Sequence, residues 1–325
     1  MDYQLTEDQA ALVSAVEAIV RDHAEMPQAE RLSYSYFDWS LQTKLTEAGF
    51  LDAARDLGPL EAALVVVEGA RIPAVVEAGV SALVVPQLLP AERLEGPVAV
   101  VAGDRLAKAH RNLSVARTAL IEDGDDVVVH AVADGEVAAE PTVYAYPYGR
   151  FLRPPQLKGA RRLAGAAATL AHWSRVALAA EFAGAADSAV QFTVEYVKQR
   201  QVFGHPIGAF QAVQHRLAQC HQVAMAVRYL ALNAAWSGQG RDADAAACYA
   251  QQHVQKLIVD LHQFNGAMGV TNEHLLHFWT YRLRALQSEA GGVYAAAQSL
   301  SNRLWGAGRP SFGDGPPTPM IARTP

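Results

Sequence analysis

The chain has 325 residues, of which 51% are hydrophobic and 18% charged, a composition typical of a globular protein with room for two or three domains. Its net charge of -6 at pH 7 argues against a general nucleic-acid-binding surface. Cys220 and Cys248 form no CxxC pair, the first ten residues lack the apolar core of a signal peptide, and no apolar run is long enough to cross a bilayer. We therefore expect a cytoplasmic protein without disulfides or membrane insertion.

Residues 1–88 are expected to form an N-terminal helical domain. Thr6 and Gln9 make a capping-box pattern, and apolar residues follow at helical spacing. A second helix is predicted within "LQTKLTEAGFLD", residues 41–52, with its end at Gly49. From residue 89 the sequence pattern changes from helical periodicity to short runs rich in β-forming residues. Examples are "PVAVVAG" and "DVVVHAVA", which are separated by turn sequences such as "EDGDD". We interpret 89–158 as a reduced, mostly antiparallel β domain.

Residues 159–325 are expected to form a four-helix bundle. The helical pattern of apolar residues is expected to begin again at about Arg161. Three long segments, around 178–196, 213–234 and 247–264, carry apolar residues three and four apart, and many of these positions are alanine. The fold class predicted is therefore mainly α with a small β domain. The Pro- and Gly-rich stretch 308–325 is expected to be irregular.

Two segments of the predicted bundle carry polar and glycine residues suited to a phosphate-bearing ligand. In "RQVFGHPIGAFQ", residues 200–211, Arg200 offers the fork geometry that fits a pyrophosphate, although an Arg at a helix end often only caps carbonyls or makes an exposed ion pair. In "QFNGAMGV", residues 263–270, Gln263 precedes a turn in which Gly266 and Gly269 permit close approach of a ligand to backbone amides.

Together with the order of helical, β and helical regions, these segments resemble the acyl-CoA dehydrogenase family. The fixed residues of the family motif Arg-x-x-Phe-Gly-x-Pro-Ile-x-x-Phe-Gln are all present, and the second motif, Gln-x-x-Gly-Gly-x-Gly, has Ala267 in place of one glycine. The resemblance implies an FAD whose ADP half is held by these segments while its flavin ring sits largely in a neighbouring subunit. The residues implied in FAD binding are Arg200, Phe203, Gln211, Gln263, Gly266 and Ala267.

The chain departs from the family at the flavin cradle and at the catalytic base. Neither a Thr-Glu-Pro-x-x-Gly-Ser-Asp loop nor a Trp-Ile-Thr strand occurs between 89 and 158. At the usual position of the catalytic Glu the chain has Ala290, with Glu289 one residue away, and at the alternative position it has Gln252. A slip of one residue turns a helical side chain by about 100°, and glutamine is no general base. Glu289 is the one candidate base, and its alternative interpretation is a solvated carboxylate.

Two further groups of side chains could bind a metal ion or a phosphate. His262, His274 and His277 lie close in sequence without a carboxylate placed beside them, so no metal site is predicted. A basic run between residues 150 and 162 is expected either to meet the phosphates of CoA or a partner's acidic face, or to form a solvated hinge; it comprises Arg150, Arg153, Lys158, Arg161 and Arg162.

Three hypotheses about the function of the chain follow from this resemblance and from the departures from it. In the first, the chain is the non-catalytic subunit of a heteromeric, α2β2, FAD-dependent acyl-CoA dehydrogenase that acts on a bulky, sterol-derived acyl-CoA. A full-length catalytic subunit would be the partner and an electron-transfer flavoprotein the acceptor. The alternatives are a self-sufficient homo-oligomeric dehydrogenase that uses Glu289 as base, and a helical scaffold protein without flavin.

Overall fold

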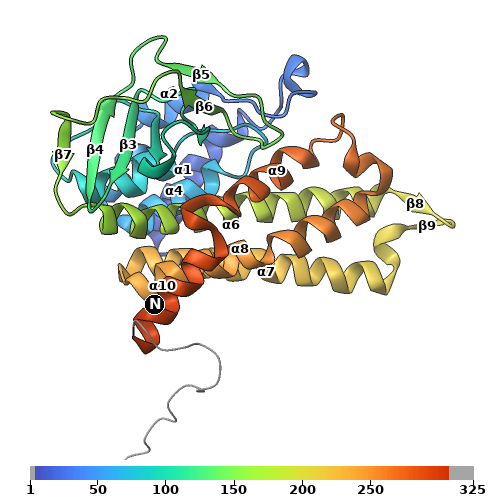
Figure 1. The fold of residues 1–325 in the computed structure, drawn as a ribbon. Helices are drawn as coiled ribbons and strands as arrows, with labels where there is room; N and C mark the ends of the chain where they lie inside the picture. Colours follow the sequence, from blue (N-terminus) through green and yellow to red (C-terminus); the bar gives the residue numbers. More distant parts are fainter. Residues whose placement is uncertain (1–3, 307–325) are drawn as a thin grey trace, which may run out of the picture.

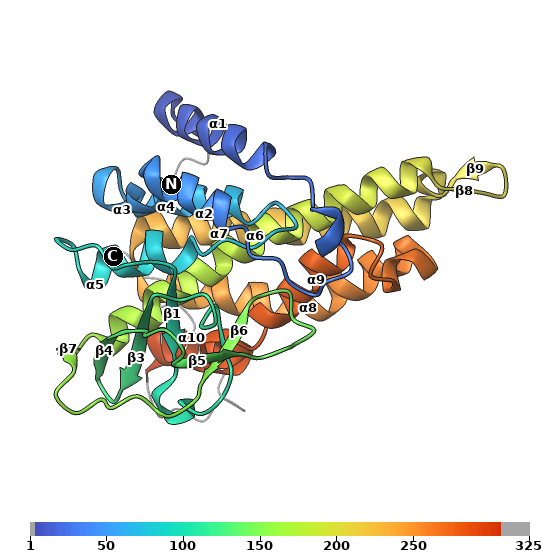
Figure 2. The same cartoon turned by 90° about the horizontal axis from the view of Figure 1, so that it is seen from above.

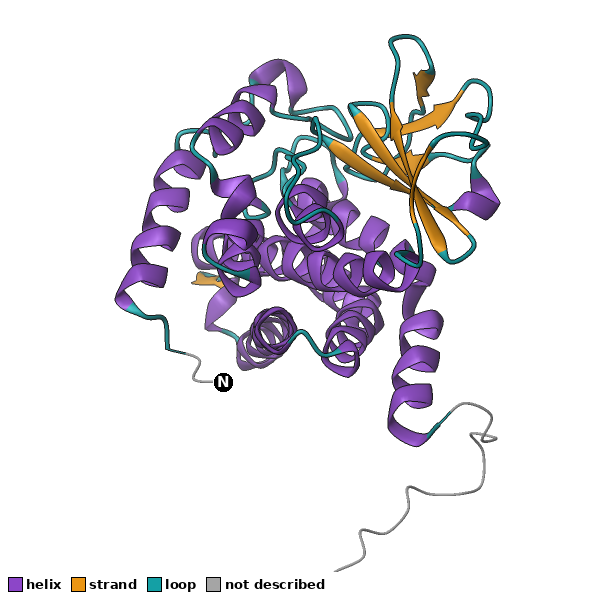
Figure 3. Cartoon of the chain, turned by 90° about the vertical axis from the view of Figure 1, so that its left-hand side faces the viewer, coloured by secondary structure: helices purple, strands orange, loops and turns teal. Residues whose placement is uncertain are grey.

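The computed structural model describes residues 4–306, so the stretch expected to be irregular lies outside the described residues. Three regions follow one another along the chain: N-terminal helices, a small β unit and a bundle of long helices (Figure 1). Figure 3 shows the strands of the β unit gathered on one side of the helices. The predicted fold class, mainly α with a small β region before a C-terminal bundle, is confirmed.

The N-terminal region begins with the predicted capping box. The Thr6 hydroxyl accepts a hydrogen bond from the Gln9 amide, and the Gln9 side chain accepts one from the Thr6 amide. The predicted second helix ends at Glu47, and Gly49 adopts a left-handed conformation. The helices of this region are α1 (Glu7–Arg21), α2 (Trp39–Glu47), α3 (Ala53–Asp56), α4 (Pro59–Gly69), a π-helical turn (Val80–Val84) and α5 (Val85–Leu88).

The β unit consists of two small sheets. One has the strand order β1-β3-β4-β7 and the other β2-β6-β5. All neighbouring strands in them are antiparallel except β1 and β3, which are parallel, so the expectation of a mostly antiparallel unit is confirmed. The strands are β1 (Val98–Val101), β2 (His110–Arg111), β3 (Thr118–Asp123), β4 (Asp126–Ala131), β5 (Val137–Ala139), β6 (Tyr148–Phe151) and β7 (Arg161–Leu163).

Strand β7 corrects one expectation. Arg161 and Arg162 pair with Val129 and Val128 of β4, beyond the limit of 158 that we set for the β domain, and helix α6 begins only at Ala167. Two arginines and a leucine show no apolar alternation that would predict a strand. The segment is a strand because it pairs with β4. The division of the whole chain into three domains stays a prediction.

The C-terminal region is the expected bundle, and its fourth member is divided in two. The long helices are α6 (Ala167–Gln199), α7 (Gln211–Ser237) and α8 (Gly240–Asn265), followed by α9 (Leu276–Leu286) and α10 (Gly292–Trp305). A 3-10 turn, Glu289–Gly291, separates α9 from α10, and Ala290 within it has a left-handed backbone with φ of 51°. The predicted apolar stripes form the buried core between these helices.

A two-stranded hairpin, β8 (Gln201–Val202) and β9 (His205–Pro206), connects α6 to α7. Its turn consists of Phe203 and Gly204, both with positive φ, as a two-residue hairpin turn requires. Figures 1 and 2 both show this hairpin projecting beyond the bundle at the end opposite to the β unit.

Candidate functional site

The residues nominated for nucleotide binding lie at one end of the bundle, the end from which the hairpin projects. Helix α6 ends at Gln199, α7 begins at Gln211 and α8 ends at Asn265. The Asn265 side-chain amide donates to the Thr193 hydroxyl over 2.9 Å, which ties the end of α8 to the last turns of α6. The fold therefore brings the two sequence motifs, more than fifty residues apart, to the same end of the molecule.

All of the nominated side chains are exposed there. Arg200, Gln211, Gln263 and Ala267 face solvent, and Phe203 at the tip of the hairpin is 91% exposed. Among residues 4–306 the Arg200 guanidinium makes no ion pair or side-chain hydrogen bond. It is therefore neither a carbonyl cap nor part of an exposed ion pair, the two alternatives that the sequence left open.

The turn after α8 has a positive φ at Gly266 but not at Gly269, which is buried against Asn265. Gly266 has φ of 58° and ψ of -144°, a region of backbone conformation essentially restricted to glycine. Three interactions hold the last turns of α8 in place: the buried one from Asn265, an ion pair between Asp260 and Arg216 of α7, and a part-buried hydrogen bond of 3.0 Å between His262 and the Thr280 hydroxyl of α9. The end of the helix is thus fixed to α6, α7 and α9.

Asp260 is the most strongly engaged carboxylate at this end. Burial alone would raise its pKa, but hydrogen bonds from Lys256 and Arg216 outweigh burial and hold the pKa below the ordinary value. The same carboxylate faces Cys220, and burial together with the Asp260 charge raises the pKa of that thiol to about 11. Cys220 is therefore an inert core residue near the candidate site.

The Glu289 side chain lies elsewhere, in a cleft of about 600 Å³ between the β unit, α6 and the Glu289–Gly291 turn. Its carboxylate is 3.7 Å from Arg111 Nε. Ala290 and Arg111 also line this cleft, and Gln252 does not. Of the two base positions inferred from the sequence, the one near residue 290 lines this cleft and the one at Gln252 does not.

Arg111 is the centre of a cluster that the sequence did not reveal. Its Nη1 donates to Glu181 Oε2 over 2.6 Å, the Tyr146 hydroxyl donates to the same oxygen over 2.8 Å, and the guanidinium lies 4.7 Å from the centroid of the Tyr146 ring. Burial alone would lower the pKa of Arg111, but Glu181 and Glu289 outweigh it, so the guanidinium stays charged. Gly79 is part of this arrangement, because a Cβ there would lie 2.3 Å from Glu181 Oε1.

The basic run is largely neutralised within the β unit and its surroundings. Arg150 pairs with Glu140, Arg161 with Glu92, and Arg162 with Asp123. The three histidines make contacts with different partners and do not converge on one point. His262 contacts the Thr280 hydroxyl, and the His277 ring contacts the carbonyl oxygens of His274 and Ser33. In the described residues no group of three or more His, Cys, Asp or Glu side chains is placed to hold a metal ion.

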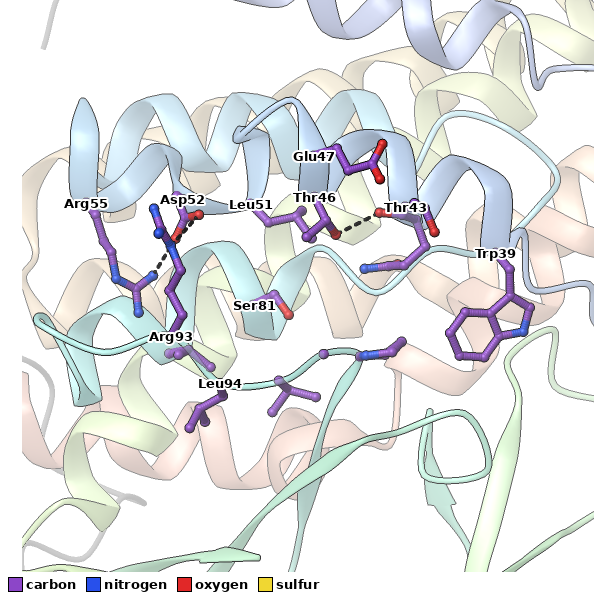
Figure 4. Close-up of a pocket in the computed structure, with 15 residues that line it drawn as sticks. Trp39, Thr43, Thr46, Glu47, Leu51, Asp52, Arg55, Ser81, Arg93 and Leu94 are labelled. Atoms are coloured by element: carbon purple, nitrogen blue, oxygen red, sulfur yellow. Dashed lines mark hydrogen bonds and ion pairs between the residues drawn. The ribbon is translucent and has the colours of Figure 1, made fainter. Parts of the chain in front are cut away.

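A second cavity, of about 350 Å³, lies among the N-terminal helices and the segment before β1 (Figure 4). Trp39 stands at one end of it, and Arg93 pairs with Asp52 over 2.9 Å at the other. No residue nominated from the sequence lines this cavity. No helix in the described part of the chain is long and apolar enough to cross a membrane.

Comparison with known proteins identifies the C-terminal region. The family described as acyl-CoA dehydrogenase, C-terminal domain, matches residues 164–293. The acyl-CoA dehydrogenase IpdE2 of Mycobacterium tuberculosis is 30% identical over 136 residues, which are 42% of this chain and 43% of that protein. The chain spans about half the length of the curated relatives that it matches first.

Solved structures extend the likeness to nearly the whole chain. The structure described as the Tcur3481-Tcur3483 steroid ACAD G363A variant is 26% identical, with 91% of this chain and 97% of that chain covered and a TM-score of 0.70. The ChsE4-ChsE5 complex from Mycobacterium tuberculosis is 24% identical, with 94% and 99% covered and a TM-score of 0.73, and it supports the fold alone. Residues 164–293 are therefore the part of the chain that is similar in sequence to the C-terminal domain of acyl-CoA dehydrogenases.

Proposed function

We propose that this chain is the non-catalytic subunit of a heteromeric, FAD-dependent acyl-CoA dehydrogenase and contributes the ADP-side half of an FAD site to a catalytic partner. The observation that carries the proposal is the separation of the two sites along α6. Glu181 belongs to the cluster beside this chain's own cleft, and Arg200 follows the last residue of α6. At 1.5 Å per residue they are about 29 Å apart, so the residues at the hairpin end and those at the cleft line two separate regions of the chain.

The residues at the hairpin end suit the nucleotide half of FAD. The Arg200 guanidinium has its donors available for a pyrophosphate, and the exposed Gly266 gives the turn after α8 a positive φ, which leaves room for close approach of a ligand. Arg200 would bind the pyrophosphate, Phe203 would pack near the adenosine, and Gln211, Gln263, Gly266 and Ala267 would hold the remaining polar edges. When bound, FAD supplies the hydride acceptor of the dehydrogenation.

Exposed apolar side chains at the same end support an interface with another subunit. Phe203 at 91%, Val270 at 71%, Met268 at 45% and Phe210 at 41% exposure surround the nominated polar residues. Large exposed side chains of this kind, next to an arginine, are typical of interface cores. A partner covering this end would bury them and would place its flavin ring in its own cleft.

The proposed substrate is a bulky acyl-CoA, and the proposed assembly is α2β2 with a full-length catalytic subunit. Two solved structures similar to this chain are named as pairs, and one of them is described as a steroid ACAD. An electron-transfer flavoprotein would take the electrons. The alternative is a homo-oligomeric enzyme that uses Glu289, since this carboxylate does face the cleft. Against it stands the contact of Glu289 with Arg111, because protonating the carboxylate would remove a counter-charge from a buried guanidinium.

Co-expression separates these proposals. The chain is purified alone and together with the acyl-CoA dehydrogenase encoded next to it, and the flavin absorbance of each preparation is measured. Bound flavin only in the co-expressed complex is the expected result. Flavin bound by the chain alone, with turnover of an acyl-CoA, would establish the homo-oligomer, and absence of flavin from both would favour a helical scaffold.

A further inference from the structure

Arg111 is a mostly buried cation whose hydrogen-bonding capacity is only partly used. A guanidinium carries five N–H donors. Within residues 4–306 the one hydrogen bond of the Arg111 side chain runs from Nη1 to Glu181, and the Tyr146 ring covers one face. Its Nε and Nη2 are therefore available to an acceptor that enters the cleft, which Arg111 lines.

A carboxylate lies close to the free Nε donor without a hydrogen bond to it. Glu289 Oε2 lies 3.7 Å from Arg111 Nε, which is too long for a hydrogen bond. The backbone of the turn is fixed, because Gln251 Nε2 donates to the Glu289 carbonyl over 2.8 Å. The side chain itself is 31% exposed and makes no hydrogen bond with any described residue. Glu289 thus occupies the position of an exchangeable counter-ion.

The remainder of the cleft is amphipathic. Ala177 and Leu178 of α6 and the Tyr148 ring give it an apolar wall, and the exposed side chain of Lys108 lines it without an ion pair to any described residue. On the same wall, Arg175 Nε is buried and has no hydrogen-bond partner in the described part of the chain. A volume of about 600 Å³ lies in the range of small-molecule sites.

We propose that this cleft binds a carboxylate-bearing ligand with an apolar body, whose carboxylate displaces Glu289 and bonds to the free donors of Arg111. A carboxylate matches the fork of a guanidinium with two parallel hydrogen bonds, which the present Glu289 geometry does not provide. The site requires neither flavin nor a partner subunit, so it goes beyond the proposed function and stands independently of it. The ligand is either a free carboxylic acid or an acyl thioester that carries a second carboxylate.

The test is calorimetric titration of the full chain, wild type and Glu289→Gln, with decanoate and with decanol. Glutamine keeps the shape of the side chain but removes the charge that competes for Arg111. We expect Glu289→Gln to bind decanoate about tenfold more tightly than wild type, in line with the gain from one charge-assisted hydrogen bond. Decanol binding is expected to be weak and equal in both proteins. A parallel titration of both proteins with decanedioyl-CoA, which carries a second carboxylate, and with decanoyl-CoA, which does not, distinguishes the thioester from the free acid. If the ligand is a thioester, Glu289→Gln binds decanedioyl-CoA more tightly than wild type does, and the two proteins bind decanoyl-CoA equally.

Two variants make the outcome specific. Asp104→Asn removes the charge of another carboxylate that lines the cleft, exposed and paired with Arg105, and is expected to change decanoate binding less than twofold, as for other exposed pairs. Lys108→Gln is expected to weaken decanoate binding severalfold. Equal decanoate affinity in wild type, Glu289→Gln and Asp104→Asn would overturn the proposal. So would weaker binding to Glu289→Gln, or decanol binding as tightly as decanoate.

Discussion

Arg111 of β2 and Glu181 of α6 form a charged hydrogen bond of 2.6 Å that joins the β unit to the bundle, and each side chain is only 11% exposed. Removing one partner of such a pair leaves a charge buried without its counter-charge. We expect Glu181→Gln to lower the free energy of unfolding by about 3 kcal/mol, the lower end of the range for buried pairs, since Glu289 remains nearby.

Chemical denaturation of the full chain measures this effect. The matched control is Glu195→Gln, which breaks the exposed pair of Glu195 with Lys198 on the same helix. It is expected to cost less than about 1 kcal/mol, as for other exposed pairs. Equal effects of the two substitutions would contradict the role of the Arg111–Glu181 pair.

The end of the bundle at which Arg200 and Gly266 lie gives the second prediction. Arg200→Ala is expected to weaken FAD binding in the complex, because a pyrophosphate loses a charged hydrogen-bond donor worth about 1.5–3 kcal/mol. Arg200→Lys keeps the charge but loses the fork, so it is expected to restore only part of the affinity. Flavin release on dilution, followed by fluorescence, measures both. The control Lys198→Ala removes the same charge two residues away, and a comparable loss there would refute a specific contact.

These two sites differ in how far the sequence predicts them. The motifs around Arg200 and Gly266 are local, with fixed residues a few positions apart at the ends of helices, so their place at one end of the bundle follows from the helix order. Arg111 and Glu181 are 70 residues apart and belong to different layers, so only the folded structure pairs them. One signal was present: Glu181 is a single carboxylate within an otherwise apolar run, "ALAAEFAGAA", and such a residue needs a buried partner.

The proposal that the partner supplies the base gives the third prediction. The substrate for this test is an acyl-CoA that carries no second carboxylate. If the partner supplies the base, kcat of the complex with Glu289→Gln stays within about twofold of wild type. The reason is that the substitution leaves general-base catalysis, which is worth about 10²–10⁴-fold, unchanged. The measurement is kcat in the co-purified assembly with saturating substrate. A loss of a hundredfold or more would identify Glu289 as the base and would establish the homo-oligomeric alternative.

The fourth prediction concerns pH and the helix end that carries the nucleotide turn. Burial lowers the pKa of His262, which contacts Thr280, and burial together with the charges of His262 and His277 lowers the pKa of His274. In the unfolded chain these imidazoles take up protons near pH 6.5. As the pH falls below about 6.5 the unfolded chain therefore binds protons first, and stability present above that pH is lost progressively toward the lower folded pKa values.

We expect the double variant His262→Gln, His274→Gln to show a shallower loss of thermal stability than wild type between pH 7 and pH 5. Melting curves at half-unit intervals measure both slopes, and an unchanged slope would place the acid sensitivity elsewhere in the chain.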